Sequence, residues 1–261
     1  MLSRVLFAAA LAAAASLVNV AARAAEVPVV AAAADLQFAL TDVAAAFAGK
    51  TGGEVKLAFG SSGNFFRQIR EGAPFEIYLS ADETFVRDLS AAGLTDGDGD
   101  LYAVGRIVLF VPYGSPLLPD GKLADLRIAL ADGRVTRFAI ANPEHAPYGR
   151  RAMEALRHEG LWEAIEDKLV LGENVSQAAQ FATAGGADGG IIAYSLALSP
   201  SVSALGDFAL IPDTWHQPLR QRMVLLKGAD ETARHFYAFM LGDEARAIMR
   251  RYGFVLPGET S

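Results

Sequence analysis

The sequence predicts an α/β fold of two lobes, and three observations carry that prediction. Short apolar segments typical of buried strands alternate along the chain with segments of helical periodicity. Glycines and helix-capping residues separate these segments. After a leader-like N-terminus, 237 of the 261 residues remain, enough for one large domain or for two domains of roughly 100–130 residues. We therefore expect mainly parallel sheets with helices packed against them.

Residues 1–24 are predicted to be a cleavable signal peptide rather than part of the fold. Arg4 precedes an almost unbroken apolar run over 5–20, and Ala22-Arg23-Ala24 has the small-x-small pattern of a cleavage site. The run is shorter than the ~20 residues of a membrane-spanning helix. We expect cleavage after Ala24 and a periplasmic protein without a lipid anchor, because the chain has no cysteine.

The first part of the chain alternates strands with helices. A helix beginning near Leu36 is indicated by apolar residues at i, i+4, i+7 and i+11, and Asp82 is expected to cap another that ends at Gly93. A short helix should follow the turn at 59–64 and end at Glu71, and 95–100 is expected to be a polar loop. The predicted strands are 27–33, 54–59, 75–79 and 106–112.

The second part repeats the alternation. Asn174 is expected to cap a helix that ends at Gly185-Gly186. The other predicted helices are 148–158, 161–167, 231–241 and 243–252. The predicted strands are 138–141, 169–171, 190–194 and 223–226. We expect a discontinuous first lobe of residues 25–109 and 214–261, with a second lobe over 110–213.

Charge and residue types restrict the partners. The chain has 23 basic and 30 acidic residues, and loss of Arg4 and Arg23 with the leader would leave a net charge of −9. This balance argues against nucleic acid and anionic membranes as partners. The four histidines lack metal-site spacing and cysteine is absent, so we expect neither a metal cation nor a cofactor.

The most informative motif is the turn Phe59-Gly60-Ser61-Ser62-Gly63-Asn64, where a strand passes into a helix. The first N–H groups of a helix have no partner within it, and that end of the helix dipole is partly positive. Similar entries lie at Ala34-Asp35, Tyr148-Gly149 and Asn174-Val175. Because ligands in open α/β sheets bind at the carboxyl ends of strands, donors from two lobes could converge on one small anion.

Several stretches together resemble the periplasmic molybdate-binding proteins of ABC transporters, which have the type II two-lobed solute-binding fold with mixed sheets. They are 30–36, 59–69, 72–75 with 80–82, 142–149, 173–175 and 251–254. The resemblance covers nearly the whole mature chain. It implies capture of molybdate or tungstate between the lobes, without catalysis, by a monomer that delivers the ion to a membrane permease.

In that family, two serine hydroxyls, backbone amides and a tyrosine hydroxyl hold the ion. Ser62 matches the second serine, with Ser61 beside it as a supporting residue, and Tyr148 and Val175 match backbone N–H donors. The family tyrosine aligns nearest Ala193, so Tyr194 fills the role only with a one-residue shift.

The first serine of the family is replaced here by Ala34 or Asp35, depending on register. An ionised carboxylate would repel a dianion in a dry cleft. We expect Asp35 to cap its own helix with the carboxylate turned from the ligand, while its own or the following backbone N–H still donates. Alternatively, Asp35 accepts a proton from a protonated oxyanion, which would favour a ligand resembling hydrogen phosphate.

Two other functions remain open from the sequence. The same fold could bind phosphate, sulfate or an organic acid. A hydrolase could pair Ser61 or Ser62 with His145, although packing or capping is the favoured role of His145, and the glycines do not form the Gly-x-Ser-x-Gly elbow.

Overall fold

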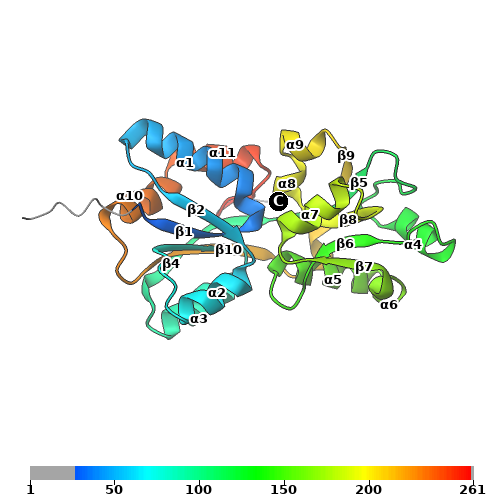
Figure 1. Ribbon diagram of the computed structural model, residues 1–261, viewed down its shortest axis with the longest axis horizontal. Helices are drawn as coiled ribbons and strands as arrows, with labels where there is room; N and C mark the ends of the chain where they lie inside the picture. The colour runs from blue at the N-terminus through cyan, green and yellow to red at the C-terminus, as the bar shows by residue number, and fades with distance from the viewer. Residues whose placement is uncertain (1–26, 260–261) are drawn as a thin grey trace, which may run out of the picture.

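The computed structural model describes residues 27–259, so the predicted signal peptide lies outside the described residues. Two lobes lie side by side along the long axis of the molecule, each built on a five-stranded sheet (Figure 1). The first sheet has the order β2 (Lys56–Gly60), β1 (Val29–Ala33), β3 (Ile77–Ser80), β10 (Leu219–Leu226), β4 (Thr95–Gly105). The second has the order β7 (Leu169–Gly172), β6 (Phe138–Ala141), β8 (Gly189–Ala193), β5 (Ile107–Pro112), β9 (Gly206–Leu210).

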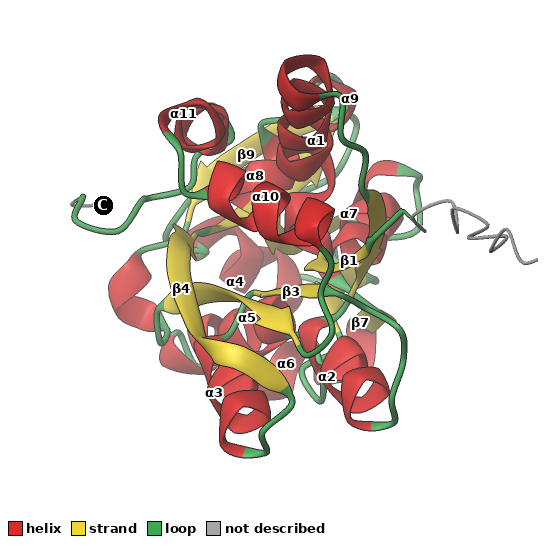
Figure 2. Cartoon of the chain, turned by 90° about the vertical axis from the view of Figure 1, so that its left-hand side faces the viewer, coloured by secondary structure: helices red, strands yellow, loops and turns green. Residues whose placement is uncertain are grey.

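Helices cover both faces of the first sheet, as Figure 2 shows. One face carries α1 (Gln37–Thr51), α10 (Glu231–Met240) and α11 (Asp243–Arg251); the other carries α2 (Ser62–Arg70) and α3 (Glu83–Ala91). Alternate residues of β1 serve the two faces: Val30 and Ala32 pack in one apolar cluster and Ala31 in the other. Burial on both faces explains why this strand is continuously apolar.

The second lobe has the same layered plan. Its core contains the buried strands β5, β6 and β8, with Phe110, Phe138 and Ile192 fully buried. Its helices are α4 (Ala124–Ala131), α5 (Pro147–His158), α6 (Trp162–Ile165), α7 (Val175–Thr183), α8 (Tyr194–Ala197) and α9 (Pro200–Ser203). Short 3-10 helices occur in both lobes: η1 (Ala34–Leu36) follows β1 in the first lobe, and η2 (Glu166–Lys168) and η3 (Asp213–Trp215) come later in the chain. Within residues 27–259, no helix is long and apolar enough to cross a membrane.

The chain passes between the lobes twice. Only Arg106 separates β4 in the first sheet from β5 in the second, and residues 211–218 lead back to β10. The predicted lobe boundary at 109 falls inside β5, which pairs along its length with β8 and β9. The sheets therefore divide at Arg106, three residues before the predicted end of the first lobe.

Both sheets are mixed rather than mainly parallel. The pairings of β1 and β6 are parallel, whereas β10 and β5, the strands that enter from the other lobe, pair antiparallel. The expected loop at 95–100 is wrong, because this segment begins β4. Its polar and glycine residues fit an edge strand whose pairing with β10 is interrupted by register shifts. The elements α4, α8, α9 and β9 had not been predicted.

Candidate functional site

A small cavity lies where the two lobes meet, at the carboxyl ends of strands from both sheets. Its lining comes from the ends of β1, β2 and β3 in one lobe and from the starts of α5 and α7 in the other. About 190 Å³ there is free of atoms. A water-sized sphere can occupy only about 10 Å³ of this space, far below the range of about 300–1,000 Å³ typical of sites for drug-sized ligands, so the site excludes ligands of that size. The lining residues are Ala33, Ala34, Asp35, Gly60, Ser61, Ser62, Ala81, Ala146, Pro147, Tyr148, Asn174 and Val175.

The serine turn supplies a hydroxyl from the first lobe. Ser61 is the N-cap of α2, and its Oγ accepts from the N–H of Asn64 at 3.3 Å. Ser62 is the first residue of α2 and is completely buried, and its Oγ accepts from the N–H of Ala81 at 3.0 Å. Because this bond uses an oxygen lone pair, the hydroxyl proton of Ser62 is left to donate into the cavity.

The second lobe supplies helix starts. Tyr148 is the second residue of α5 and Val175 is the first residue of α7. Asn174 caps α7, with its Oδ1 accepting from the N–H of Gln177 at 3.0 Å. The backbone N–H groups of Tyr148 and Val175 fall in the first turns of their helices, where no carbonyl of the same helix can accept them. The cavity therefore combines dipoles and uncharged donors from two lobes.

Among the residues that the structure describes, Asp35 is the only acidic or basic one that lines this cavity. Its Oδ2 accepts from the hydroxyl of Tyr148 at 3.0 Å and from Nε2 of Gln221 at 2.7 Å. The amide of Gln221 is itself oriented by the hydroxyl of Tyr102, which donates to Oε1 at 2.7 Å. Burial raises the pKa of the Asp35 carboxyl from 3.8 to about 6, against the lowering effect of the bonds from Gln221 and Tyr148.

The expectation that Asp35 caps its own helix is wrong. Ala33 and Leu36 occupy the N-cap positions of η1 and α1, and neither helix start receives a side-chain cap. The carboxylate instead accepts from Gln221 of its own lobe and from Tyr148 of the second lobe, so the bond to Tyr148 joins the lobes. Sequence reasoning missed this network because β10 lies 186 residues from Asp35 in the chain.

The tyrosine hydroxyl at the site also differs from expectation. Tyr194 is absent from the cavity lining; its ring packs against Phe208, with centroids 5.8 Å apart, and against Gly253. Tyr148, expected to offer only its backbone, brings its side chain to Asp35. Burial raises the pKa of Tyr148 well above its usual value, so this hydroxyl stays protonated.

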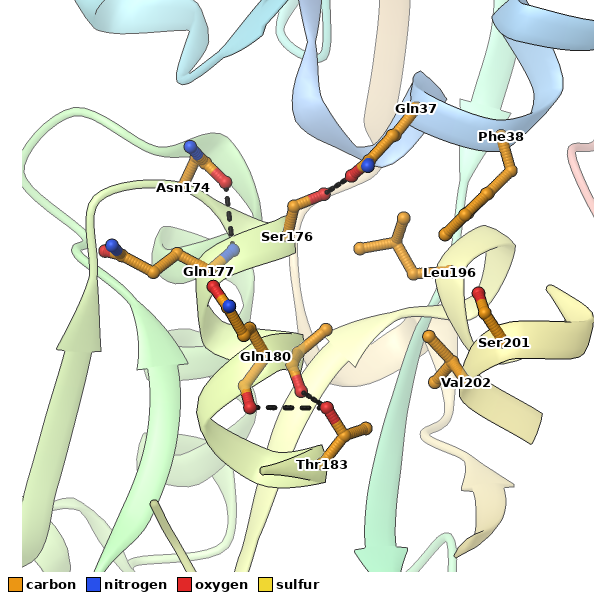
Figure 3. A pocket seen from close by; sticks show the side chains of 11 residues that line it. Gln37, Phe38, Asn174, Ser176, Gln177, Gln180, Thr183, Leu196, Ser201 and Val202 are labelled. Carbon is orange, nitrogen blue, oxygen red and sulfur yellow. Dashed lines mark hydrogen bonds between the residues drawn. The ribbon is translucent and has the colours of Figure 1, made fainter. Parts of the chain in front are cut away.

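Further contacts join the lobes beside the cavity. The N–H of Gly63 donates to the carbonyl of His145 at 3.0 Å, and Ser61 Oγ lies 2.9 Å from Nδ1 of His145. Ser176 Oγ in α7 lies 3.0 Å from the carbonyl of Ala34 and 2.7 Å from Oε1 of Gln37. Figure 3 shows this second contact at the edge of a neighbouring open groove. The lobes are thus closed upon each other.

The contact of Ser61 with His145 tests the hydrolase alternative. Nε2 of His145 lies 3.6 Å from a carboxylate oxygen of Glu173, so Ser61, His145 and Glu173 make successive side-chain contacts. However, Ser61 is only 3% exposed, and its hydroxyl oxygen already caps α2. The arrangement joins the lobes rather than presenting a nucleophile to a substrate. Among residues 27–259, no cluster of His, Cys, Asp or Glu could hold a metal ion.

The comparisons with known proteins agree with the two-lobed fold. Residues 28–255 match the family described as bacterial extracellular solute-binding protein. The chain is 39% identical to the molybdate-binding protein ModA of Rhodobacter capsulatus, with 82% of each chain covered. It is 37% identical to ModA of Azotobacter vinelandii, with 93% of this chain and 94% of that one covered. The solved periplasmic molybdate-binding protein of Azotobacter vinelandii superimposes with a TM-score of 0.80 at 31% identity, covering 88% of this chain and 99% of that one.

Proposed function

The chain belongs to the family of bacterial extracellular solute-binding proteins, and from this premise we propose that it captures molybdate for an ABC importer. Two molybdate-binding proteins are 39% and 37% identical to it, and the matches cover 82% and 94% of those proteins. It is therefore a binding protein rather than an enzyme. Its role is to hold a tetrahedral oxyanion between two lobes until a transporter accepts the ion.

The observation that carries the proposal is the meeting of Ser62 and Val175 in one small cavity. Ser62 comes from the first lobe and Val175 from the second, and both line the same small space. Hydrogen bonds to a charged acceptor contribute roughly 1.5–3 kcal/mol each. Several such bonds around a desolvated dianion can hold it without a lysine or arginine, and none lines the cavity among the described residues.

We assign roles by the groups that reach the cavity. The hydroxyl of Ser62 and the backbone N–H groups of Tyr148 and Val175 would donate to the oxyanion, with the backbone at Ala34-Asp35 as a further donor. Ser61 would support the site by capping α2. Tyr194 receives no role, because its ring lies against Phe208 and Gly253.

The finer features follow from the same proposal. Tungstate shares the charge and shape of molybdate, so it should bind in the same cavity. Sulfate and phosphate present the same tetrahedral acceptors, so cavity size would discriminate against sulfate. We further propose export by a signal peptide at 1–24, a monomeric periplasmic protein, and a permease that contacts both lobes.

Calorimetry and thermal unfolding with molybdate, tungstate, sulfate and phosphate test the proposal. A ligand that binds only the folded state raises the unfolding midpoint by mass action. We expect molybdate and tungstate to raise it strongly and sulfate weakly. Absence of a shift with any of the four ions at about 1 mM would refute oxyanion capture, and a shift with phosphate alone would assign another ligand.

A further inference from the structure

Asp35 has one carboxylate oxygen with no hydrogen-bond partner. Its Oδ2 accepts from Tyr148 and Gln221, whereas Oδ1 is buried and accepts from no side chain or backbone group of the described residues. The residue is 1% exposed and lines the cavity. A buried oxygen without a partner is unfavourable, so Oδ1 marks a place where a hydrogen-bonding group is missing.

Within the described part of the chain, the groups that bond to this carboxyl group are uncharged. From α5 it is faced by the Tyr148 hydroxyl, from β10 by the Gln221 amide and from β4 by the Tyr102 hydroxyl. From α8, Ser195 donates to the backbone carbonyl of Asp35 at 2.8 Å rather than to its carboxylate. Burial keeps both tyrosines protonated by raising their pKa. Asp35 is thus the group of this network that can change its charge near neutral pH.

We propose that the oxyanion is bound together with one proton, which is held on Oδ1 of Asp35 and directed at a ligand oxygen. This inference rests on the proposed function and adds a chemical condition to it. Asp35 becomes a ligand-binding residue through a neutral carboxyl group, standing where the family resemblance implies a serine hydroxyl. When a dianion binds, the proton is taken up from solvent. When a singly protonated oxyanion binds, the ligand itself brings the proton. Both routes give the same complex.

The electrostatic reason is the proximity of like charges. A dianion beside an ionised carboxylate in a dry cavity is strongly repelled, and the lower-energy arrangement shares a proton between them. Once Asp35 is protonated, its Oδ1–H becomes a donor and Oδ2 keeps both of its bonds. One proton therefore removes the repulsion and gives the unpartnered oxygen a hydrogen-bond acceptor.

The inference predicts how affinity depends on pH. In the free protein the Asp35 carboxyl has a pKa of about 6, so it is about 1% protonated at pH 8 and about 90% protonated at pH 5. Proton uptake per bound ion should be close to one at pH 8 and about 0.1 at pH 5. The affinity should fall about tenfold for each pH unit above 6.

Calorimetric titration with sodium molybdate at pH 5 and pH 8 tests this, in pairs of buffers that differ in ionisation enthalpy. The slope of apparent enthalpy against buffer enthalpy gives the number of protons taken up. In Asp35→Asn, the side chain keeps an acceptor for Tyr148 and Gln221 and places an amide donor at Oδ1. This variant should take up no proton and bind with an affinity independent of pH.

Two further variants control for other acids and bases. Glu144→Gln removes an exposed carboxylate from the loop beside His145 and should keep an uptake near one. His145→Asn removes the side chain that contacts Ser61, so it should weaken binding, but proton uptake per bound ion should stay near one. Tight molybdate binding without proton uptake at pH 8, or uptake that persists in Asp35→Asn, would overturn the inference. Absence of molybdate binding at both pH values would instead refute the proposed function.

Discussion

A methyl group at position 63 should hold the two lobes apart. A Cβ at Gly63 would lie 2.5 Å from the carbonyl oxygen of His145 in the other lobe, whereas ordinary contact begins at 3.4 Å. In the variant, the closing lobes would therefore stop about 0.9 Å short of the position observed here, measured between this Cβ and the carbonyl oxygen. Because the N–O and Cβ–O lines meet at an angle of about 50°, the nitrogen of Gly63 would then lie about 3.6 Å from the same carbonyl oxygen, too far for the bond that it makes at 3.0 Å.

The expected loss of affinity follows from the lost contacts. The bonds of His145 to Gly63 and Ser61 contribute about 1 kcal/mol each, so Gly63→Ala should weaken molybdate binding by about 2 kcal/mol, or about thirtyfold. The free protein should be no less stable, because alanine is favoured over glycine in a helix by about 1 kcal/mol. Calorimetry measures the affinity, urea unfolding measures the stability, and solution X-ray scattering measures lobe closure.

Gly49→Ala is the matched control. Gly49 lies inside α1, has no neighbour within 4 Å of an added Cβ and has an ordinary negative φ. The Gly49→Ala variant should therefore bind molybdate with the affinity of the original protein. An affinity of Gly63→Ala within threefold of the original protein, with equal compaction on adding molybdate, would refute the argument that this glycine is needed for lobe closure.

Three further outcomes are expected. Ser62→Ala should weaken molybdate binding at least tenfold in calorimetry and lower the free energy of unfolding by about 1–3 kcal/mol, because the buried N–H of Ala81 loses its acceptor; unchanged affinity would contradict the site. Because the folded Asp35 carboxyl keeps its proton to a higher pH than the unfolded one, the free protein should lose stability through this group as pH rises from about 4 to 6. In urea unfolding, Asp35→Asn should therefore be more stable than the original protein by up to about 3 kcal/mol at pH 7.5 and nearly equal at pH 4, and the reverse order would exclude a destabilising buried carboxylate. Tyr194→Phe should leave the molybdate dissociation constant within twofold, since the ring packs on Phe208 away from the cavity; a tenfold loss would restore the expected role of its hydroxyl.

Local patterns correctly predicted the starts of two helices, α7 and α3. Asn174 and Asp82 cap α7 and α3 as expected, because a capping side chain bonds to backbone groups two or three residues away. The segment 95–100 was misjudged for a complementary reason. Its aspartates and glycines are typical of turns, and only pairing with β10, more than 100 residues later, makes it a strand.

The orientation of side chains in the cavity could not be predicted in the same way. Tyr148 and Tyr194 each stand at the start of a helix after a buried segment, yet only Tyr148 reaches the cavity. The choice depends on how each helix packs on its sheet, which neighbouring residues in sequence do not determine.

By itself the sequence determined that this is a two-lobed α/β protein. It also determined that several of its helices begin with donors of the kind that binds a small anion. Capping, strand periodicity and glycine turns act over a few residues, so they can be recognised without knowing what lies opposite. Tertiary structure alone decided that Asp35 meets Gln221 within its own lobe and Tyr148 across the junction of the lobes, with its second oxygen unpartnered. The charge state of that carboxyl depends on burial and on partners 113 and 186 residues away, and these arise only when the chain has folded.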